Sequence, residues 1–136
     1  MASKDYQGSC HCGQVKFEAK VDLAEGTSKC NCTNCWKKRF WSVRVKPENF
    51  RYLAGQEQLS KYKPGQEKGH GGFCKQCGVH MFGWVDVSEW NPTEYVSVNV
   101  AALDKVDPAD LVAAPVTFCD GLNNNWWNPP AETRYL

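Results

Sequence analysis

The sequence predicts an all-β fold made of many short strands and loops. Three observations support this prediction. Apolar and polar residues alternate with a period of two in short segments, those segments are rich in β-branched and aromatic residues, and turn-forming pairs separate them. Evidence for helix is confined to two short stretches. The 136 residues correspond to the length of one domain, so we expect residues 1–136 to share a single core.

Six strands are expected along the chain, at residues 15–21, 40–45, 50–53, 59–63, 79–87 and 94–100. In the first of them every second residue from Val15 to Val21 is apolar, which is typical of a half-buried strand. The second and third flank a turn at 47–49, and the fourth ends at the turn-forming pair Pro64-Gly65. The last two are rich in Val, Phe, Trp and Tyr, which favour strands.

Two short helical turns are expected. One follows Cys32, and the other lies near residues 108–111, where Asp107 can cap the helix and Pro108 can take its first position. The stretch 120–130 is rich in Asn, Trp and Pro, so it is expected to form an irregular loop. The core of a small β domain is too small to stabilise long loops, and a bound metal ion commonly holds such loops in place.

The composition argues against several classes of protein. Hydrophobic residues make up 42% and charged residues 23% of the chain, as in soluble globular proteins. The formal net charge of +1 gives no reason to expect a nucleic acid or an anionic membrane surface as the main partner. No apolar run approaches the roughly 20 residues of a membrane-spanning helix. Residues 1–7 lack the apolar core of a secretory signal, so we expect a cytoplasmic protein.

Cysteine usage is the strongest signal in the sequence. The chain has eight cysteines, and in a secreted protein this even number would suggest four disulfides. In a reducing cytosol stable disulfides are rare, and closely spaced cysteines there indicate a metal site or catalysis. We therefore interpret the cysteines first as metal ligands.

Seven cysteines fall into three clusters, namely Cys10 and Cys12, then Cys30, Cys32 and Cys35, then Cys74 and Cys77, while Cys119 stands alone. A structural zinc site requires four tetrahedral ligands, and no single cluster provides four. The first and third clusters together complete a closed four-thiolate site. The middle cluster provides three thiolates and leaves the fourth position open.

Glycine placement favours this division. The first and third clusters are each followed directly by a glycine, Gly13 and Gly78. A glycine there lets the backbone turn tightly, so that amide groups point at the sulfurs. The middle cluster is followed by Trp36, which does not suit such a turn. The two glycine-marked turns therefore belong together.

Other assignments remain open. All seven clustered cysteines can be structural, with a water molecule, His11, His70 or His80 completing the second site. His11 lies between two expected ligands and is more simply a solvent contact. His70 lies in a glycine-rich loop that can reach a site, and His80 alternates with apolar residues of an expected strand. Cys119 is most simply a small buried residue.

These clusters, in this order and spacing, resemble the family of glutathione-dependent formaldehyde-activating enzymes, which also includes centromere protein V. The matching motifs are residues 8–15, 30–35, 73–78 and 99–104, and the resemblance covers roughly residues 6–111. It implies a zinc-ribbon-derived fold of short antiparallel strands in two or three small sheets. It also implies two zinc ions, a structural one at Cys10, Cys12, Cys74 and Cys77 and a catalytic one at Cys30, Cys32 and Cys35.

The resemblance further implies a zinc-dependent carbon–sulfur lyase-type activity, in which the thiol of glutathione adds to formaldehyde to give S-hydroxymethylglutathione. An open three-thiolate zinc suits this chemistry, because zinc lowers the pKa of a bound thiol. The expected partners are glutathione or a related small thiol, and a small aldehyde or other electrophile. Two alternatives stay open, a non-catalytic thiol carrier and a protein-interaction module with two structural zinc ions.

Bulky and basic residues follow the middle cluster, where members of the family commonly have small ones. Lys37, Lys38 and Arg39 form either a solvated face or a clamp for the carboxylates of glutathione. Trp126 and Trp127 form either a lid over the open zinc or part of the core. The family resemblance therefore leaves the substrate less well defined than the metal ligands.

Overall fold

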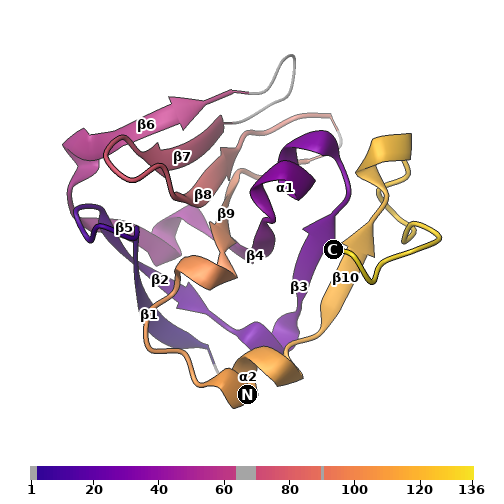
Figure 1. Cartoon of the computed structure of the whole chain (residues 1–136), viewed down its shortest axis with the longest axis horizontal. Coiled ribbons are helices and arrows are strands. Elements are labelled where there is room, and N and C mark those ends of the chain that lie inside the picture. The colour runs from indigo at the N-terminus through magenta and orange to yellow at the C-terminus, as the bar shows by residue number, and fades with distance from the viewer. Residues whose placement is uncertain (1–2, 64–69, 90) are drawn as a thin grey trace.

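The computed structural model describes residues 3–63, 70–89 and 91–136. In these residues ten strands form two sheets, one of three strands and one of seven (Figure 1). The α-helices of the described residues are two short ones, α1 (Thr33–Lys38) and α2 (Pro108–Ala113). The all-β class expected from the sequence is confirmed.

The smaller sheet contains β1 (Lys4–Ser9), β2 (Lys16–Val21) and β5 (Phe50–Ala54), in the order β1-β2-β5. Both pairings in this sheet are antiparallel. Along β2, Phe17, Ala19 and Val21 are buried, whereas its two lysines are exposed. The period-two pattern of the sequence therefore gives this sheet one apolar face.

The larger sheet has the strand order β10-β3-β4-β9-β8-β7-β6. In chain order its strands are β3 (Thr27–Cys30), β4 (Trp41–Val45), β6 (Leu59–Tyr62), β7 (His70–Cys74), β8 (His80–Val85), β9 (Tyr95–Asn99) and β10 (Val116–Cys119). Neighbouring strands pair antiparallel except β10 and β3, which are parallel. This pair departs from the antiparallel pattern that was expected, and the long stretch of chain between the two strands makes the crossover possible.

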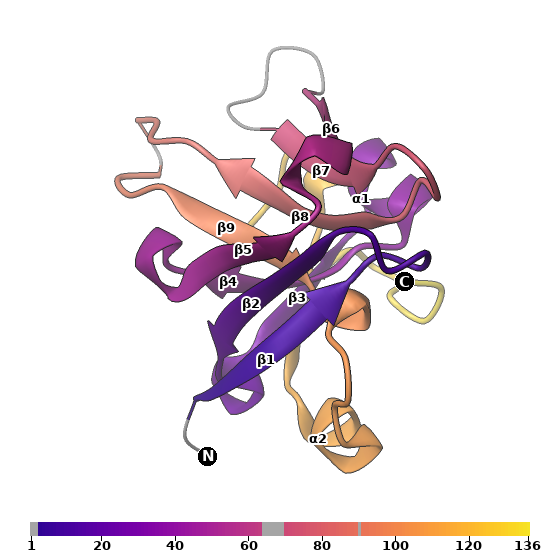
Figure 2. The ribbon, with the colours of Figure 1, turned by 90° about the vertical axis from the view of Figure 1, so that its left-hand side faces the viewer.

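The two sheets pack against each other around a cluster of aromatic rings. The ring centroid of Phe82 on β8 lies 5.4 Å from that of Phe17 on β2 and 4.9 Å from that of Phe50 on β5. Figure 2 shows β1 and β2 in front of β3 and β4. Phe17 and Phe82 are fully buried, and burying each such ring contributes roughly 1.5–3 kcal/mol to folding.

Both helices begin where the sequence predicted. The carboxylate of Asp107 caps α2 by accepting a hydrogen bond from the backbone of Ala109 at 2.9 Å, and Pro108 takes the first helical position. α1 starts directly after Cys32, whose sulfur accepts a hydrogen bond from the backbone of Cys35. Neither helix is long or apolar enough to cross a membrane, and the described residues contain no other candidate.

The six expected strands correspond to β2, β4, β5, β6, β8 and β9. The expected turn at 47–49 is one of five short 3-10 helices in the described part of the chain, which are η1 (Leu23–Glu25), η2 (Pro47–Asn49), η3 (Gln56–Gln58), η4 (Val100–Ala102) and η5 (Gly121–Asn123). The turn at Pro64-Gly65 lies outside the described residues. Four strands, β1, β3, β7 and β10, were not predicted. Polar residues dominate β1 and two glycines lie in β7. Hydrogen bonds with neighbouring strands, rather than intrinsic preference, therefore place these two strands in a sheet.

Candidate functional site

Two groups of cysteine sulfurs come together in the fold. The Sγ atoms of Cys10, Cys12, Cys74 and Cys77 all lie within 4.8 Å of one another, and so do those of Cys30, Cys32 and Cys35. We call these groups the four-cysteine site and the three-cysteine site. They are the two sets into which spacing and glycine placement divided the clusters. No other group of three or more possible metal ligands occurs among residues 3–63, 70–89 and 91–136.

The four-cysteine site joins two turns that are distant in sequence, the β1–β2 turn and the β7–β8 turn. The Sγ of Cys12 lies 3.6 Å from that of Cys10 and 3.7 Å from that of Cys74. Four thiolates at about 2.3 Å from a tetrahedral zinc ion would be separated by about 3.8 Å, so the spacing fits. The backbone amides of Cys12 and Val79 donate hydrogen bonds to Cys77 and lower the pKa of its thiol to about 6.

Glycines shape both turns of this site. Gly13 has a φ of 81° and Gly78 a φ of 76°, values at which any other residue is strained. The amide of Gly13 donates to the carbonyl of Cys10 at 3.1 Å, and the amide of Gly78 donates to the carbonyl of Cys74 at 2.8 Å. The amide of Val15 points at the sulfur of Cys10 at 3.4 Å. The tight glycine turns predicted from the sequence are thus present.

The three-cysteine site is built from one short segment. Cys30 ends β3, Cys32 caps α1, and Cys35 lies in the first turn of α1 (Figure 1). The backbone amide of Cys32 donates to the sulfur of Cys30 at 3.4 Å, and that of Cys35 donates to the sulfur of Cys32 at 3.3 Å. All three cysteines are half-buried. Local hydrogen bonds therefore orient the sulfurs of Cys30 and Cys32, and the sulfur of Cys35 lies close to both.

Hydrogen bonds among these thiols separate their pKa values. Donation from Cys30 and Cys35 lowers the pKa of Cys32 to about 2. The pKa of Cys35 is raised, first by Cys30 and then by Cys32 and by burial. One thiolate therefore forms readily here, whereas a second and a third need a cation to offset their charge. A set of three closely spaced thiols suits a divalent ion with an affinity for sulfur, such as zinc.

A pocket of about 140 Å³ opens beside the three-cysteine site. It is lined by Lys29, Cys30, Cys35, Trp36, Arg39, Phe40, Trp41, Ala101 and Leu136. Two of the three cysteines reach this pocket, together with two cationic side chains and three aromatic rings. The pocket thus combines sulfur ligands with positive charge, which is an arrangement that an anionic thiol can use.

The structure places the three cations expected from the sequence in different surroundings. Arg39 lines the pocket, Lys37 is exposed on α1, and neither Lys37 nor Lys38 is among the residues that line it. The ammonium group of Lys38 lies 5.8 Å from the ring centroid of Phe40. The second pocket cation is Lys29, whose ammonium lies 5.2 Å from the ring centroid of Trp41. Its position directly before the cluster was a signal that sequence reasoning missed.

A loop from the other end of the chain closes against the three-cysteine site. The side-chain amide of Asn31 donates to the buried carboxylate of Asp120 at 2.8 Å, and its carbonyl accepts from the backbone of Leu122 at 3.0 Å. A Cβ on Gly121 would lie 2.6 Å from the Sγ of Cys30 and 2.6 Å from the ring of Trp126. Asn31 thereby ties the loop to the site, and Gly121 fits between sulfur and indole. No local sequence pattern indicated this contact.

The three candidate histidines do not join the sulfurs of either site. His11 is exposed. His70 belongs to β7 rather than to a loop and stacks on Trp84 at 6.5 Å between ring centroids, and burial lowers its pKa. His80 packs at 5.0 Å on Phe73. None of the three histidines belongs to a described metal-ligand group.

Cys119 and the tryptophan pair have identifiable neighbours. Cys119 is half-buried and pairs in register with Cys30 of the parallel strand β3, and burial raises the pKa of its thiol. Its sulfur is not within the three-cysteine group. Trp127 is 82% exposed, so a place in the core is excluded for it. Trp126 is half exposed and covers Gly121 beside the site.

Two comparisons with known proteins bear on this geometry. A family model described as glutathione-dependent formaldehyde-activating enzyme matches residues 5–120, which include all seven clustered cysteines. The chain is also similar to the crystal structure of a protein from Rhodobacter sphaeroides, with 31% sequence identity and a TM-score of 0.67. That match covers 82% of this chain and 99% of the other.

Proposed function

The chain belongs to the family of glutathione-dependent formaldehyde-activating enzymes, and from this membership we propose that it activates the thiol of glutathione for addition to formaldehyde or another small electrophile. The observation that supports the proposal most directly is the meeting of three cysteine sulfurs and two cations at one pocket. A thiol that carries carboxylates finds there a place for its sulfur and partners for its charge. The activity is of the carbon–sulfur lyase type, written in the direction of bond formation.

The reaction needs neither an oxidant nor a reductant. The thiol sulfur bonds to the carbonyl carbon, the π bond of the carbonyl group breaks, and the thiol proton ends on the former carbonyl oxygen. With glutathione and formaldehyde the product is S-hydroxymethylglutathione. The protein therefore has to favour the thiolate form and hold the two reactants together.

Cys30, Cys32 and Cys35 would hold a zinc ion as the catalytic cofactor. When bound, zinc supplies a fourth position at which a thiol loses its proton near neutral pH. Three cysteinates carry more negative charge than a histidine-rich site, so the site favours a soft sulfur nucleophile over hydrolytic chemistry. The four-cysteine site would hold a second, structural zinc ion that fastens the β1–β2 turn to the β7–β8 turn.

Lys29 and Arg39 would bind the carboxylates of the thiol. Both line the pocket that Cys30 and Cys35 also reach, whereas Lys37 is exposed on α1. Of the three cations expected from the sequence we therefore retain Arg39 as the carboxylate ligand and add Lys29. Their positive charges also offset the negative charge of the thiolates.

Cobalt substitution tests the proposal directly. Cobalt(II) in the three-cysteine site should show a change in its absorption bands when glutathione is added, because a sulfur ligand enters the open position. NMR exchange spectroscopy should then show faster addition of glutathione to formaldehyde with the zinc-loaded protein than without it. Unchanged cobalt bands at saturating glutathione would contradict thiol binding at the metal and would favour the interaction module. Changed bands without faster addition would indicate a carrier.

Variants of the cations separate the pocket from general surface charge. Lys29→Ala and Arg39→Ala should each weaken glutathione binding about two- to fivefold, with a smaller effect at high salt, as for partly exposed ion pairs. Lys37→Ala is the matched control, since it removes a nearby cation outside the pocket lining. Equal effects of all three substitutions would show that the pocket cations have no specific role.

A further inference from the structure

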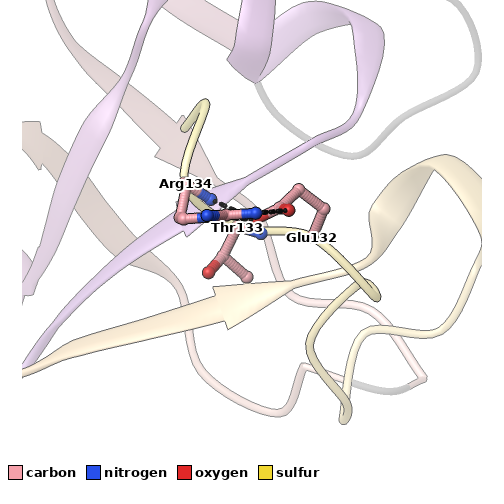
Figure 3. A network of polar contacts seen from close by, with 3 residues as sticks. All are labelled: Glu132, Thr133 and Arg134. Carbon is pink, nitrogen blue, oxygen red and sulfur yellow. Dashed lines mark hydrogen bonds and ion pairs between the residues drawn. The ribbon is translucent and has the colours of Figure 1, made fainter.

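The segment 132–136 forms a turn, which we call the C-terminal hook, and Figure 3 shows the polar contacts among its first three residues. The carboxylate of Glu132 accepts hydrogen bonds from the backbone amides of Thr133 and Arg134, both at 3.1 Å. It also accepts from the Nε of Arg134 at 2.9 Å and from its Nη2 at 2.7 Å. The amide of Leu136 donates to the carbonyl of Thr133 at 3.0 Å. The hook therefore has a defined shape set by its own residues.

The C-terminal hook lies on the pocket of the three-cysteine site. The guanidinium of Arg39 donates to the carbonyl of Tyr135 at 2.8 Å, and the ammonium of Lys29 donates to the main-chain oxygen of Leu136 at 3.4 Å. The ring of Tyr135 meets the ring of Trp36 edge to face, with 5.5 Å between centroids. Leu136 is itself part of the pocket lining. Both pocket cations are thus engaged by main-chain oxygens of the hook.

The size of the pocket indicates that the docked hook leaves too little room for a peptide ligand. Sites for small organic ligands usually measure about 300–1,000 Å³, whereas the pocket under the hook measures about 140 Å³. A formaldehyde molecule would fit this volume, but a tripeptide would not. A carboxylate is a stronger acceptor for Arg39 than the peptide carbonyl of Tyr135, because the hydrogen bond then joins two charges. A peptide thiol with free carboxylates can therefore displace the hook.

We propose that the C-terminal hook is an internal competitor for the anion-binding end of the pocket, and that it must lift for an anionic peptide thiol to bind. This inference rests on the proposed function for the identity of the ligand. With the hook docked, the peptide-binding form of the protein is only a fraction of the population, and the apparent dissociation constant rises as the reciprocal of that fraction. A hook docked about nine-tenths of the time would weaken binding about tenfold.

S-methylglutathione is the probe for this competition, because it carries both carboxylates but no thiol that can reach a metal. Isothermal titration should show that deletion of residues 132–136 from the zinc-loaded protein tightens its binding by about three- to tenfold. Arg134→Ala, which removes the side-chain bridge to Glu132, should tighten it by a smaller factor. Arg51→Ala is the matched control, since it breaks an exposed ion pair with Glu18 on the smaller sheet and should leave binding unchanged.

NMR gives a readout that does not depend on affinity. In the unmodified protein the ring resonances of Tyr135, which meets the ring of Trp36 while the hook is docked, should shift when S-methylglutathione is added. Weaker binding after deletion would overturn the inference, because the hook would then be part of the binding site. Unchanged binding, or no binding to any form, would overturn it as well. If only the proposed binding of the thiol at the metal were wrong, S-methylglutathione would still bind more tightly after the deletion. The cobalt bands would then stay unchanged when glutathione is added.

Discussion

Gly121 is the residue whose substitution tests the architecture of the three-cysteine site most sharply. In Gly121→Ala the new Cβ would lie 2.6 Å from the Sγ of Cys30 and 2.6 Å from ring atoms of Trp126. Non-bonded heavy atoms prefer a separation of about 3.5–4.0 Å, so the sulfur or the indole has to move by about 1 Å. The sulfur is held by the backbone amide of Cys32 at 3.4 Å, and the loop is held by Asn31.

The cost of such overpacking is about 1–3 kcal/mol. If this strain displaces the Cys30 sulfur, the metal affinity of the three-cysteine site drops about 5- to 150-fold. The assay is competition with a chromogenic chelator, which reports the release of each metal ion separately. Gly121→Ala should speed release from the weaker site and leave the stronger site unchanged.

Gly13→Ala provides the contrasting control at the other site. A Cβ there has no heavy atom within 4 Å, but Gly13 has a φ of +81°, so the substitution strains the backbone without a clash. It should cost about 1 kcal/mol and affect only the four-cysteine site. If Gly121→Ala released metal from the three-cysteine site at the same rate as the unmodified protein, the idea that the 120–126 loop fixes the Cys30 sulfur would be refuted.

Three further predictions concern the metals and the hook. We expect about two zinc ions per chain, with the three-cysteine site emptied first by a weak chelator because three ligands hold zinc less completely than four; a single tightly bound zinc in metal analysis would contradict this. Cys77→Ser should unfold or badly destabilise the protein, whereas Cys35→Ser should stay folded but lose thiol binding. Equal losses of melting temperature in the two variants would show that both sites are structural. Hydrogen bonds from Arg134 lower the pKa of Glu132 from its ordinary value of 4.5 to about 2. The ionised carboxylate that stabilises the hook therefore persists as the pH falls below 4.5 and is lost only toward pH 2. NMR between pH 6 and 4 should therefore show no titration of Glu132 unless Arg134 is replaced by Ala, and titration in the unmodified protein would disprove the contact.

Much of the fold and of the metal-ligand sets could be predicted because the deciding contacts are local. The cap of α2 depends on Asp107 and an amide two residues away, and the glycine turns depend on residues within one cluster. Strands such as β2 can be predicted because apolar and polar residues alternate along them. Strands β1, β3 and β7 could not be predicted, because polar residues and glycines give them little preference for a strand until a neighbour supplies hydrogen bonds. Strand β10 contains residues that favour strands, but its four residues are too few to show a clear alternation.

The amino-acid sequence by itself determined the class of fold, the division of the cysteine clusters into four and three, and the short helix that carries Cys35. Tertiary structure alone decided what surrounds the open site. Gly121 meets the sulfur of Cys30 because β10 pairs with β3, and the C-terminal hook reaches Lys29 and Arg39 from more than ninety residues away along the chain. Contacts between such distant segments depend on how two sheets and a returning chain pack together, and no periodicity or spacing in the sequence encodes that packing locally.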